Sequence, residues 1–353
     1  MRKRRKTLAV ELNPPIKGFT VFSLSILATN EVYLPWFYSQ HIQLYFTNKW
    51  IQEGIPKIDF YRPPNNRLLP SPLLETRWLD RDLISIVNED IVQFVIKYID
   101  KDYYIQLYLN EFYMTDRSSY KSIKTIHEVL VHGYDLDDET FDIVGYNKIG
   151  HYGSSKLNFS DFRKAYMEID SSDFRKAYMK INYSPNHMAK IGLLKYENNR
   201  HYEFDINLVS EQLRDYIESS NTSERFRILD MPEDDIYGVE VYRCFIHYLL
   251  EKKDKYDIRL FHILWEHKKC MLNRLIYMEN EGYLDPREKL SITYAKIEKE
   301  IGDLRLVMLR IKLGYKKENE IYTSIKYVTT KLEELAYKEK NILETVLLRC
   351  ESS

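Results

Sequence analysis

The sequence predicts an α+β protein, and three patterns support this prediction. Short runs of aromatic and β-branched residues, typical of strands, lie in the first half of the chain. Apolar residues at helical spacing dominate the second half. The chain has 353 residues, which allows about two domains. We expect an α+β domain with an antiparallel sheet at 15–200, and a helical domain with a long helical hairpin at 201–353.

Composition excludes several classes of partner. The 52 basic and 53 acidic residues nearly balance, which argues against a nucleic-acid partner. The basic cluster at 2–6 is expected to be a solvated chain end. The apolar stretch at 19–28 is too short for a membrane helix and lacks a clear cleavage site. Three cysteines make no disulfide framework. We therefore expect a cytoplasmic protein without a membrane partner.

The first hundred residues mix helical and irregular segments. Pro35 begins a segment with helical spacing over 35–48. The prolines and asparagines of 55–72 predict an irregular loop or extended arm. An apolar stripe with steps of three and four residues predicts a helix over 80–99.

The sheet is expected to follow these helices. Strands are predicted at 103–109, 126–134 and 141–146, and the acidic turn 135–139 joins the last two as a hairpin. A tandem repeat comes next, with SDFRKAYMEIDS at 160–171 and SDFRKAYMKINY at 172–183. Because a continuous helix would rotate the two apolar faces apart, each copy is predicted to be its own short helix.

The remainder of the chain is predicted to be helical. Helices are expected around 208–217, at 239–250 and at 257–278. A heptad seam then runs over 290–311 and ends at Gly314, and a second seam follows over 321–335. These seams predict two long antiparallel helices, either as a packing hairpin or as the surface of a homo-oligomer.

A short motif carries the candidate chemistry. Residues 126–147 read IHEVLVHGYDLDDETFDIVGYN, so that His127 opens the second predicted strand. The spacing from His127 through five residues to Gly133, Tyr134 and Asp135 resembles a segment of papain-like proteins. It is most similar to the family named for the N-terminal domain of butirosin biosynthesis protein H, itself similar to the C39-type peptidases.

The resemblance implies thiol chemistry: acyl transfer from a carrier-protein thioester to an amine, with His127 as the general base. Relatives carry an aspartate near Gly145, and Asn147 shares that strand face, where it could orient the imidazole. The expected nucleophile window, 30–40, contains no cysteine. Ser39 is the only aliphatic hydroxyl of the predicted helix before Thr47, and it matches the cysteine position poorly.

These features lead to one functional expectation and two alternatives. We expect an accessory protein of nonribosomal peptide biosynthesis, a degenerate papain-like acyltransferase scaffold. It would bind an acyl or peptidyl carrier protein, its thioester, or a peptide synthetase. One alternative is an active acyltransferase that uses His127 without a cysteine. The other is a non-enzymatic oligomerising scaffold. No cofactor and no metal are expected, because His262, His267 and Cys270 are spread around one predicted helix.

Overall fold

The chain forms two compact units. The computed structural model describes residues 3–18, 20–48, 54, 56–63, 71–87, 89–169, 190–315 and 318–352. Unit 1 consists of Met1–Tyr33 and Leu68–His201, and unit 2 of Leu34–Arg67 and Tyr202–Ser353. The expected domains, 15–200 and 201–353, differ from these units chiefly at 34–67, which belong to unit 2. The predicted α+β class is confirmed.

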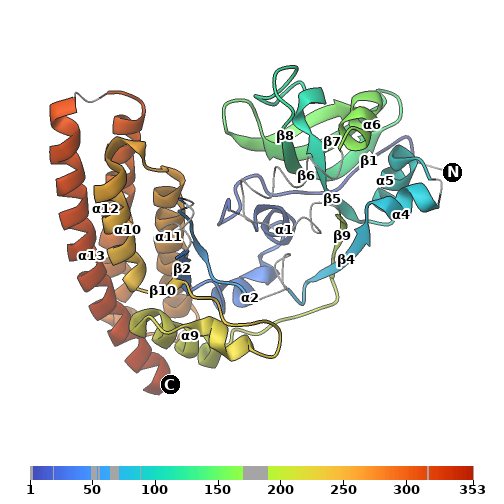
Figure 1. The fold of residues 1–353 in the computed structure, drawn as a ribbon. Coiled ribbons are helices and arrows are strands. Elements are labelled where there is room, and N and C mark those ends of the chain that lie inside the picture. The colour runs from blue at the N-terminus through green and yellow to red at the C-terminus, as the bar shows by residue number, and fades with distance from the viewer. Residues whose placement is uncertain are drawn as a thin grey trace. The chain divides into compact units, whose positions relative to one another are not determined.

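An antiparallel sheet forms the centre of unit 1 (Figure 1). Its strand order is β4-β9-β5-β6-β7-β8, and β1 pairs with β6 off this path. The strands are β1 (Arg5–Thr7), β4 (Leu74–Asp80), β5 (Tyr104–Asn110), β6 (Ile126–Asp135), β7 (Thr140–Tyr146), β8 (Tyr152–Asn158) and β9 (Lys190–Tyr196). The three predicted strands and their hairpin are confirmed as β5, β6 and β7.

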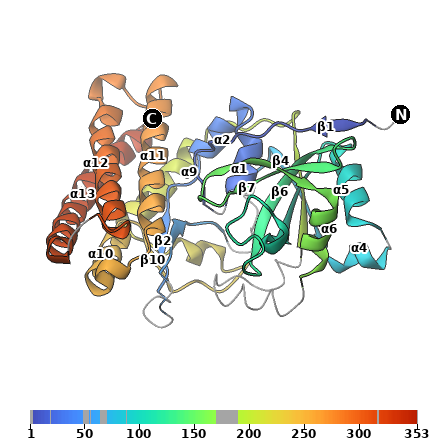
Figure 2. The same ribbon diagram turned by 90° about the horizontal axis from the view of Figure 1, so that it is seen from above.

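Helices cover both faces of this sheet. Helices α5 (Ile91–Ile99) and α6 (Phe159–Met167) share a core with Val129 and Val131 of β6. Alternate residues point to the opposite face. There Tyr152 of β8 hydrogen-bonds Ser25 of the fully buried helix α1 (Val21–Leu27), with 2.8 Å between the hydroxyl oxygens. Figure 2 shows α1 and the α5–α6 pair on different sides of the strands.

Two of the predictions for the first hundred residues were wrong in unit 1. The basic cluster is not a frayed end, because β1 pairs with β6 and the Lys6 ammonium lies 2.7 Å from the Asp102 carboxylate. The helix expected over 80–99 is instead the end of β4, the short helix α4 (Asp82–Ile86), and α5. The Asp90 carboxylate accepts hydrogen bonds from the main-chain N–H groups of Val92 and Gln93, so that a new helix begins there.

The first copy of the tandem repeat forms α6, as predicted, with Asn158 as its N-cap. The second copy, 172–183, lies outside the described residues. Strands β8 and β9 were not predicted. β8 reads YGSSKLN, whose small polar residues carry no strand signal.

Unit 2 combines a small sheet with helices (Figure 1). The sheet has the order β10-β2-β3, formed by Ile236–Tyr237, Leu44–Phe46 and Ile58–Phe60. The helices are α2 (Leu34–Tyr38), α9 (Ile206–Glu218), α10 (Glu240–Lys252), α11 (Arg259–Asn280), α12 (Leu290–Lys312) and α13 (Glu318–Ser352). Short 3₁₀ turns lie at Glu31–Tyr33 and Glu111–Tyr113 in unit 1 and at Thr222–Phe226, Lys253–Lys255 and Pro286–Glu288 in unit 2.

The predicted helix over 35–48 was wrong beyond residue 38. The main chain of His41 has φ 59°, a left-handed conformation that ends helical geometry, and β2 begins at Leu44. Arg274 of α11 is buried and holds this turn by donating to the carbonyl oxygens of Tyr38 and His41 at 2.8 and 3.1 Å. The strand β3 likewise lies inside the segment predicted to be irregular.

The helical half follows its prediction closely. The first heptad seam is buried along α12, from Leu290 to Ile311, and Gly314 follows with φ 77°. The antiparallel partner is α13, whose Ile325, Val328 and Leu332 are buried. No helix within the described ranges is both long enough and apolar enough to cross a membrane.

A buried polar network ties the helices of unit 2 together. The Glu339 carboxylate of α13 lies 2.8 Å from the Lys268 ammonium of α11, and both side chains are fully buried. Three tyrosine hydroxyls donate to the same carboxylate: Tyr216 of α9, Tyr242 of α10 and Tyr294 of α12. One carboxylate therefore organises five helices, and its acceptor sites are well satisfied.

The burial of His41 predicts acid sensitivity. Desolvation and the nearby Arg274 charge lower the pKa of the His41 imidazole to about 3, against roughly 6.5 in the unfolded chain. Between these values the unfolded chain binds a proton that the folded chain excludes. The free energy of unfolding should therefore fall by about 1.4 kcal/mol per pH unit below pH ~6.5 from His41 alone.

Urea titrations of the wild type and of His41→Asn should measure this effect. Asparagine tolerates the left-handed main chain and does not titrate. The slope of the unfolding free energy against pH should be shallower in the variant, by the amount that corresponds to the uptake of about one proton. Identical slopes for the two proteins would contradict the assignment.

Candidate functional site

His127 lies at the start of β6 in unit 1, where it faces the same side of the sheet as Val129 and Val131. Its side chain is 45% exposed, unlike those of the buried residues that follow it on this face. It is paired across the strands with Leu109, close to the end of β5. The ring is therefore fixed by a central strand and remains open to solvent.

Glu111 is the carboxylate beside this ring. It follows β5 in a 3₁₀ turn, where its main-chain N–H donates to Thr125 and its side chain is 9% exposed. One carboxylate oxygen lies 3.2 Å from Nδ1 of His127. A carboxylate at Nδ1 favours a proton on that nitrogen, which leaves Nε2 as the acceptor of the neutral ring.

Arg117 completes a line of charges behind the pair. Its side chain is 1% exposed, with one guanidinium nitrogen 2.6 Å from Asp116 and another 3.7 Å from Glu111. The order of side chains is Asp116, Arg117, Glu111 and then the His127 ring. The Arg117 charge offsets part of the cost of burying the Glu111 carboxylate.

Gly145 leaves the space that Arg117 occupies. A Cβ atom at Gly145 would lie 2.7 Å from Nη2 of Arg117, closer than unstrained contacts allow. Gly145 also lies on the same face as Ile143, which belongs to the core beneath α5 and α6. The space beside Gly145 is thus filled by an arginine from another segment.

This contact predicts a difference between two paired glycines. Gly145→Ala should lower the free energy of unfolding by about 1–3 kcal/mol, because the buried guanidinium must move. Gly153 is directly opposite in the ladder, and its added Cβ would meet only the His151 ring at 3.5 Å. Urea unfolding of Gly153→Ala should therefore match the wild type within about 0.5 kcal/mol. Equal losses in the two variants would show that the Arg117 contact is unimportant.

Asn147, the expected orienting residue, has a different environment. Its side-chain oxygen accepts hydrogen bonds from the main-chain N–H groups of Ile149 and His151, at 3.1 and 3.0 Å. These bonds shape the turn between β7 and β8, and Glu111 is the residue beside the His127 ring. Sequence reasoning missed Glu111 and Arg117. The available signal was the position of Glu111, just past the strand that pairs with β6.

The candidate nucleophiles lie in unit 2. The Ser39 hydroxyl is buried, donates to the carbonyl oxygen of Pro35 at 2.7 Å and accepts from the N–H of Asp205 at 2.8 Å. All three cysteines also belong to unit 2. Burial raises the pKa of the Cys270 thiol to about 12 and that of Cys350 to about 11, and it also raises the pKa of Cys244. None of the three thiols is therefore activated.

His267 and His132 have structural environments. Nε2 of His267 donates to the carbonyl oxygen of Ile42 at 2.7 Å, and its Nδ1 lies 3.0 Å from the Lys268 ammonium. His132 is buried, with Nδ1 2.8 Å from the Leu8 carbonyl oxygen. Among the residues that the structure describes, no group of three or more metal-binding side chains gathers.

Comparisons with known proteins leave the family open. No protein-family model matches the chain, and no curated protein matches it. Fold and site define its class as an α+β unit with a carboxylate-oriented histidine, followed in sequence by helices around a buried ionic network.

Proposed function

We propose that the protein acts in nonribosomal peptide or related secondary metabolism, with unit 1 as a papain-like acyl-transfer scaffold and His127 as its general base. The half-exposed His127 ring, with a buried carboxylate 3.2 Å from Nδ1, carries the proposal. A base needs an accessible nitrogen and a defined orientation; the half-exposed ring offers the first, and the carboxylate beside Nδ1 favours the second. The resemblance around His127 supports an acyl thioester on a carrier protein as the substrate.

The reaction would be direct aminolysis of that thioester. The amine nitrogen attacks the thioester carbonyl carbon as Nε2 of His127 accepts its proton. The tetrahedral intermediate then expels the thiolate of the carrier's prosthetic arm, which takes the proton from the imidazolium. An amide and a free thiol result, so atoms and charge balance without an enzyme-bound acyl group. Glu111 stabilises the transient imidazolium.

This route predicts resistance to thiol alkylation. Iodoacetamide reacts with thiolates, and the pKa values of all three cysteine thiols are raised by burial. Treated protein should keep its acyl-transfer rate, or its carrier affinity, within about twofold of the untreated protein, since no step uses a thiol nucleophile. Inactivation that disappears when one of Cys244, Cys270 or Cys350 is replaced by serine would contradict the route.

A second candidate function is carrier binding without catalysis. The absence of cysteine from unit 1 favours it, because the implied family chemistry uses a thiol nucleophile. Such an accessory protein would hold a carrier protein or a peptide synthetase during chain assembly.

Two measurements separate these candidates. Under both candidate functions, immobilised acyl-loaded carrier protein should retain the chain in a pull-down. Transfer of the acyl group to an added amine, followed by mass spectrometry, should occur only under the first. Retention without transfer supports the accessory role, and neither retention nor transfer overturns both proposals.

A further inference from the structure

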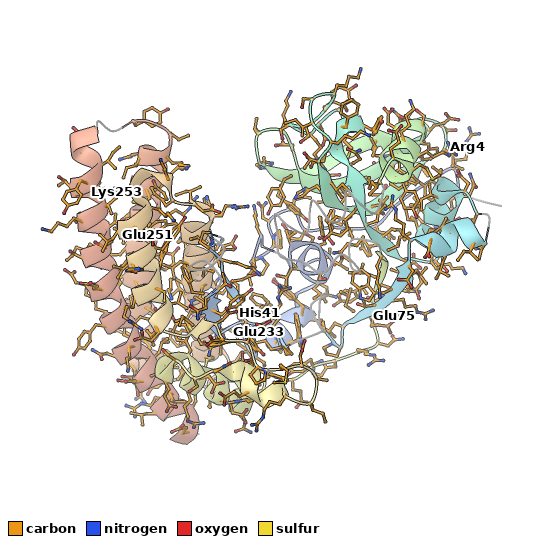
Figure 3. All side chains as sticks on the ribbon, viewed as in Figure 1. Arg4, His41, Glu75, Glu233, Glu251 and Lys253 are labelled. Carbon is orange, nitrogen blue, oxygen red and sulfur yellow. The ribbon has the colours of Figure 1, made fainter. Side chains whose placement is uncertain are left out.

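Unit 2 contains a pocket that the proposed function does not use. Its volume is 390 Å³, within the range of roughly 300–1,000 Å³ that is typical of small-molecule sites. It lies where α10 ends, α11 begins and α12 ends, and Figure 3 marks the end of α10 with Glu251 and Lys253. Its ten lining residues include Lys252, Lys255, Tyr256, Asp257, Arg259 and Lys312.

The lining is strongly cationic in a nearly neutral chain. Four of its ten residues are lysine or arginine and one is aspartate, an excess of three positive charges, whereas the whole chain carries a net charge of −1. The four cations come from α10, the 3₁₀ turn after it, α11 and α12. Segments distant in sequence therefore bring positive charge to one concave surface, which attracts anions.

Helix-end electrostatics account for only part of this cluster. Lys252 and Lys312 are the last residues of α10 and α12, where a cation complements the helix dipole. Arg259 is the first residue of α11, where the dipole disfavours a cation, and the first turn of that helix holds no acidic residue. The Asp257 carboxylate lies 2.6 Å from the Arg259 guanidinium and caps its main-chain N–H, which offsets this repulsion.

Lys312 retains hydrogen-bonding capacity, whereas the Lys252 ammonium lies 2.7 Å from the Glu251 carboxylate. The Lys312 ammonium donates to the carbonyl oxygen of Tyr256 at 3.2 Å, which leaves further N–H groups on the same nitrogen. The centroid of the buried Tyr256 ring lies 5.7 Å from this ammonium, and the Tyr256 hydroxyl donates a hydrogen bond to the carbonyl oxygen of Met308 in α12. Lys255 is exposed on the rim. The pocket thus combines a buried aromatic wall with ammonium groups that can donate further hydrogen bonds.

We propose that this pocket binds a small phosphorylated anion through Lys255, Lys312 and Arg259. Phosphoryl oxygens accept several hydrogen bonds at once, and ammonium and guanidinium groups are their usual protein donors. Among such anions a diphosphate group fits best, because its negative charge is similar in size to the excess positive charge of the lining residues. The pocket is independent of His127 and of the acyl-transfer proposal.

Calorimetric titration of the full chain with pyrophosphate tests this site. Titrations with sodium chloride and with sulfate at equal ionic strength serve as controls. Saturable binding of pyrophosphate is expected, and added salt should weaken it. Lys255→Gln with Lys312→Gln should weaken the affinity by about tenfold or more, since each removes a charge-assisted hydrogen bond. Adenosine diphosphate provides a second arm: tighter binding than pyrophosphate identifies a nucleotide ligand, and weaker binding an inorganic one.

The matched control is Lys296→Gln with Lys299→Gln, which removes the same charge from exposed positions of α12 outside the pocket. This protein should bind like the wild type, and circular dichroism should show both variants folded. Absence of saturable binding in the wild type overturns the site, as does equal binding by the two double variants, which would indicate a general charge effect.

Discussion

Glu339→Ala should destabilise unit 2 by about 3–5 kcal/mol, because it leaves the Lys268 ammonium buried without its partner. Both side chains are fully buried, and the carboxylate and ammonium are 2.8 Å apart. Burial lowers the pKa of Lys268 and raises that of the surrounding tyrosine hydroxyls. Removal of the carboxylate also leaves these hydroxyls without an acceptor, which adds to the loss.

Chemical unfolding followed by helical circular dichroism measures this effect. Glu334→Ala provides the control, because Glu334 also lies on α13 and pairs with Lys331, but on the surface. That pair should contribute less than about 1 kcal/mol. Lys268→Met combined with Glu339→Leu should recover part of the stability, because no charge then remains buried. Similar losses for Glu339→Ala and Glu334→Ala would show that the buried network is not a main source of stability.

His127→Ala should reduce the rate of acyl transfer by roughly 10²–10⁴-fold, the usual contribution of a general base. The ring is 45% exposed, so its loss should change the free energy of unfolding by less than about 1 kcal/mol. Glu111→Gln should lower the rate while leaving the ring in place, because an amide stabilises the imidazolium less than a carboxylate does.

The control for the His127→Ala and Glu111→Gln variants is His151→Ala. His151 is an exposed histidine of the same unit, close to the turn that Asn147 shapes. Its replacement should alter neither the rate nor the stability. A large stability loss in His127→Ala, without transfer activity in either protein, would identify His127 as a structural residue and leave the accessory role.

Elements with strong periodicity were predictable from the sequence. The strands β5, β6 and β7 are rich in aromatic and branched apolar residues, and the heptad seam of α12 repeats without interruption. The segment at 35–48 misled because its apolar spacing fits a helix, whereas the left-handed turn at His41 depends on contacts with the distant Arg274. Strand β1 was missed because its pairing with β6 spans more than 120 residues.

Of the residues that form the candidate site, the sequence indicated only His127. The motif around His127 indicated a base at a strand start, and the structure places the ring there, half exposed. Glu111 has no motif of its own, and its proximity follows from the register of β5 and β6. Arg117 reaches the site because a glycine stands at position 145, a steric relation that becomes visible only in three dimensions.

Single-turnover acyl transfer by a cysteine-free protein is the most direct test of the proposed chemistry. Cys244, Cys270 and Cys350 would be replaced by serine, and transfer from a loaded carrier protein to an amine would be timed with and without His127. We expect the cysteine-free protein to keep the wild-type rate, and the additional His127→Ala change to lower it by roughly 10²–10⁴-fold. Loss of transfer on removal of the cysteines, or an undiminished rate without His127, would contradict a thiol-independent general base.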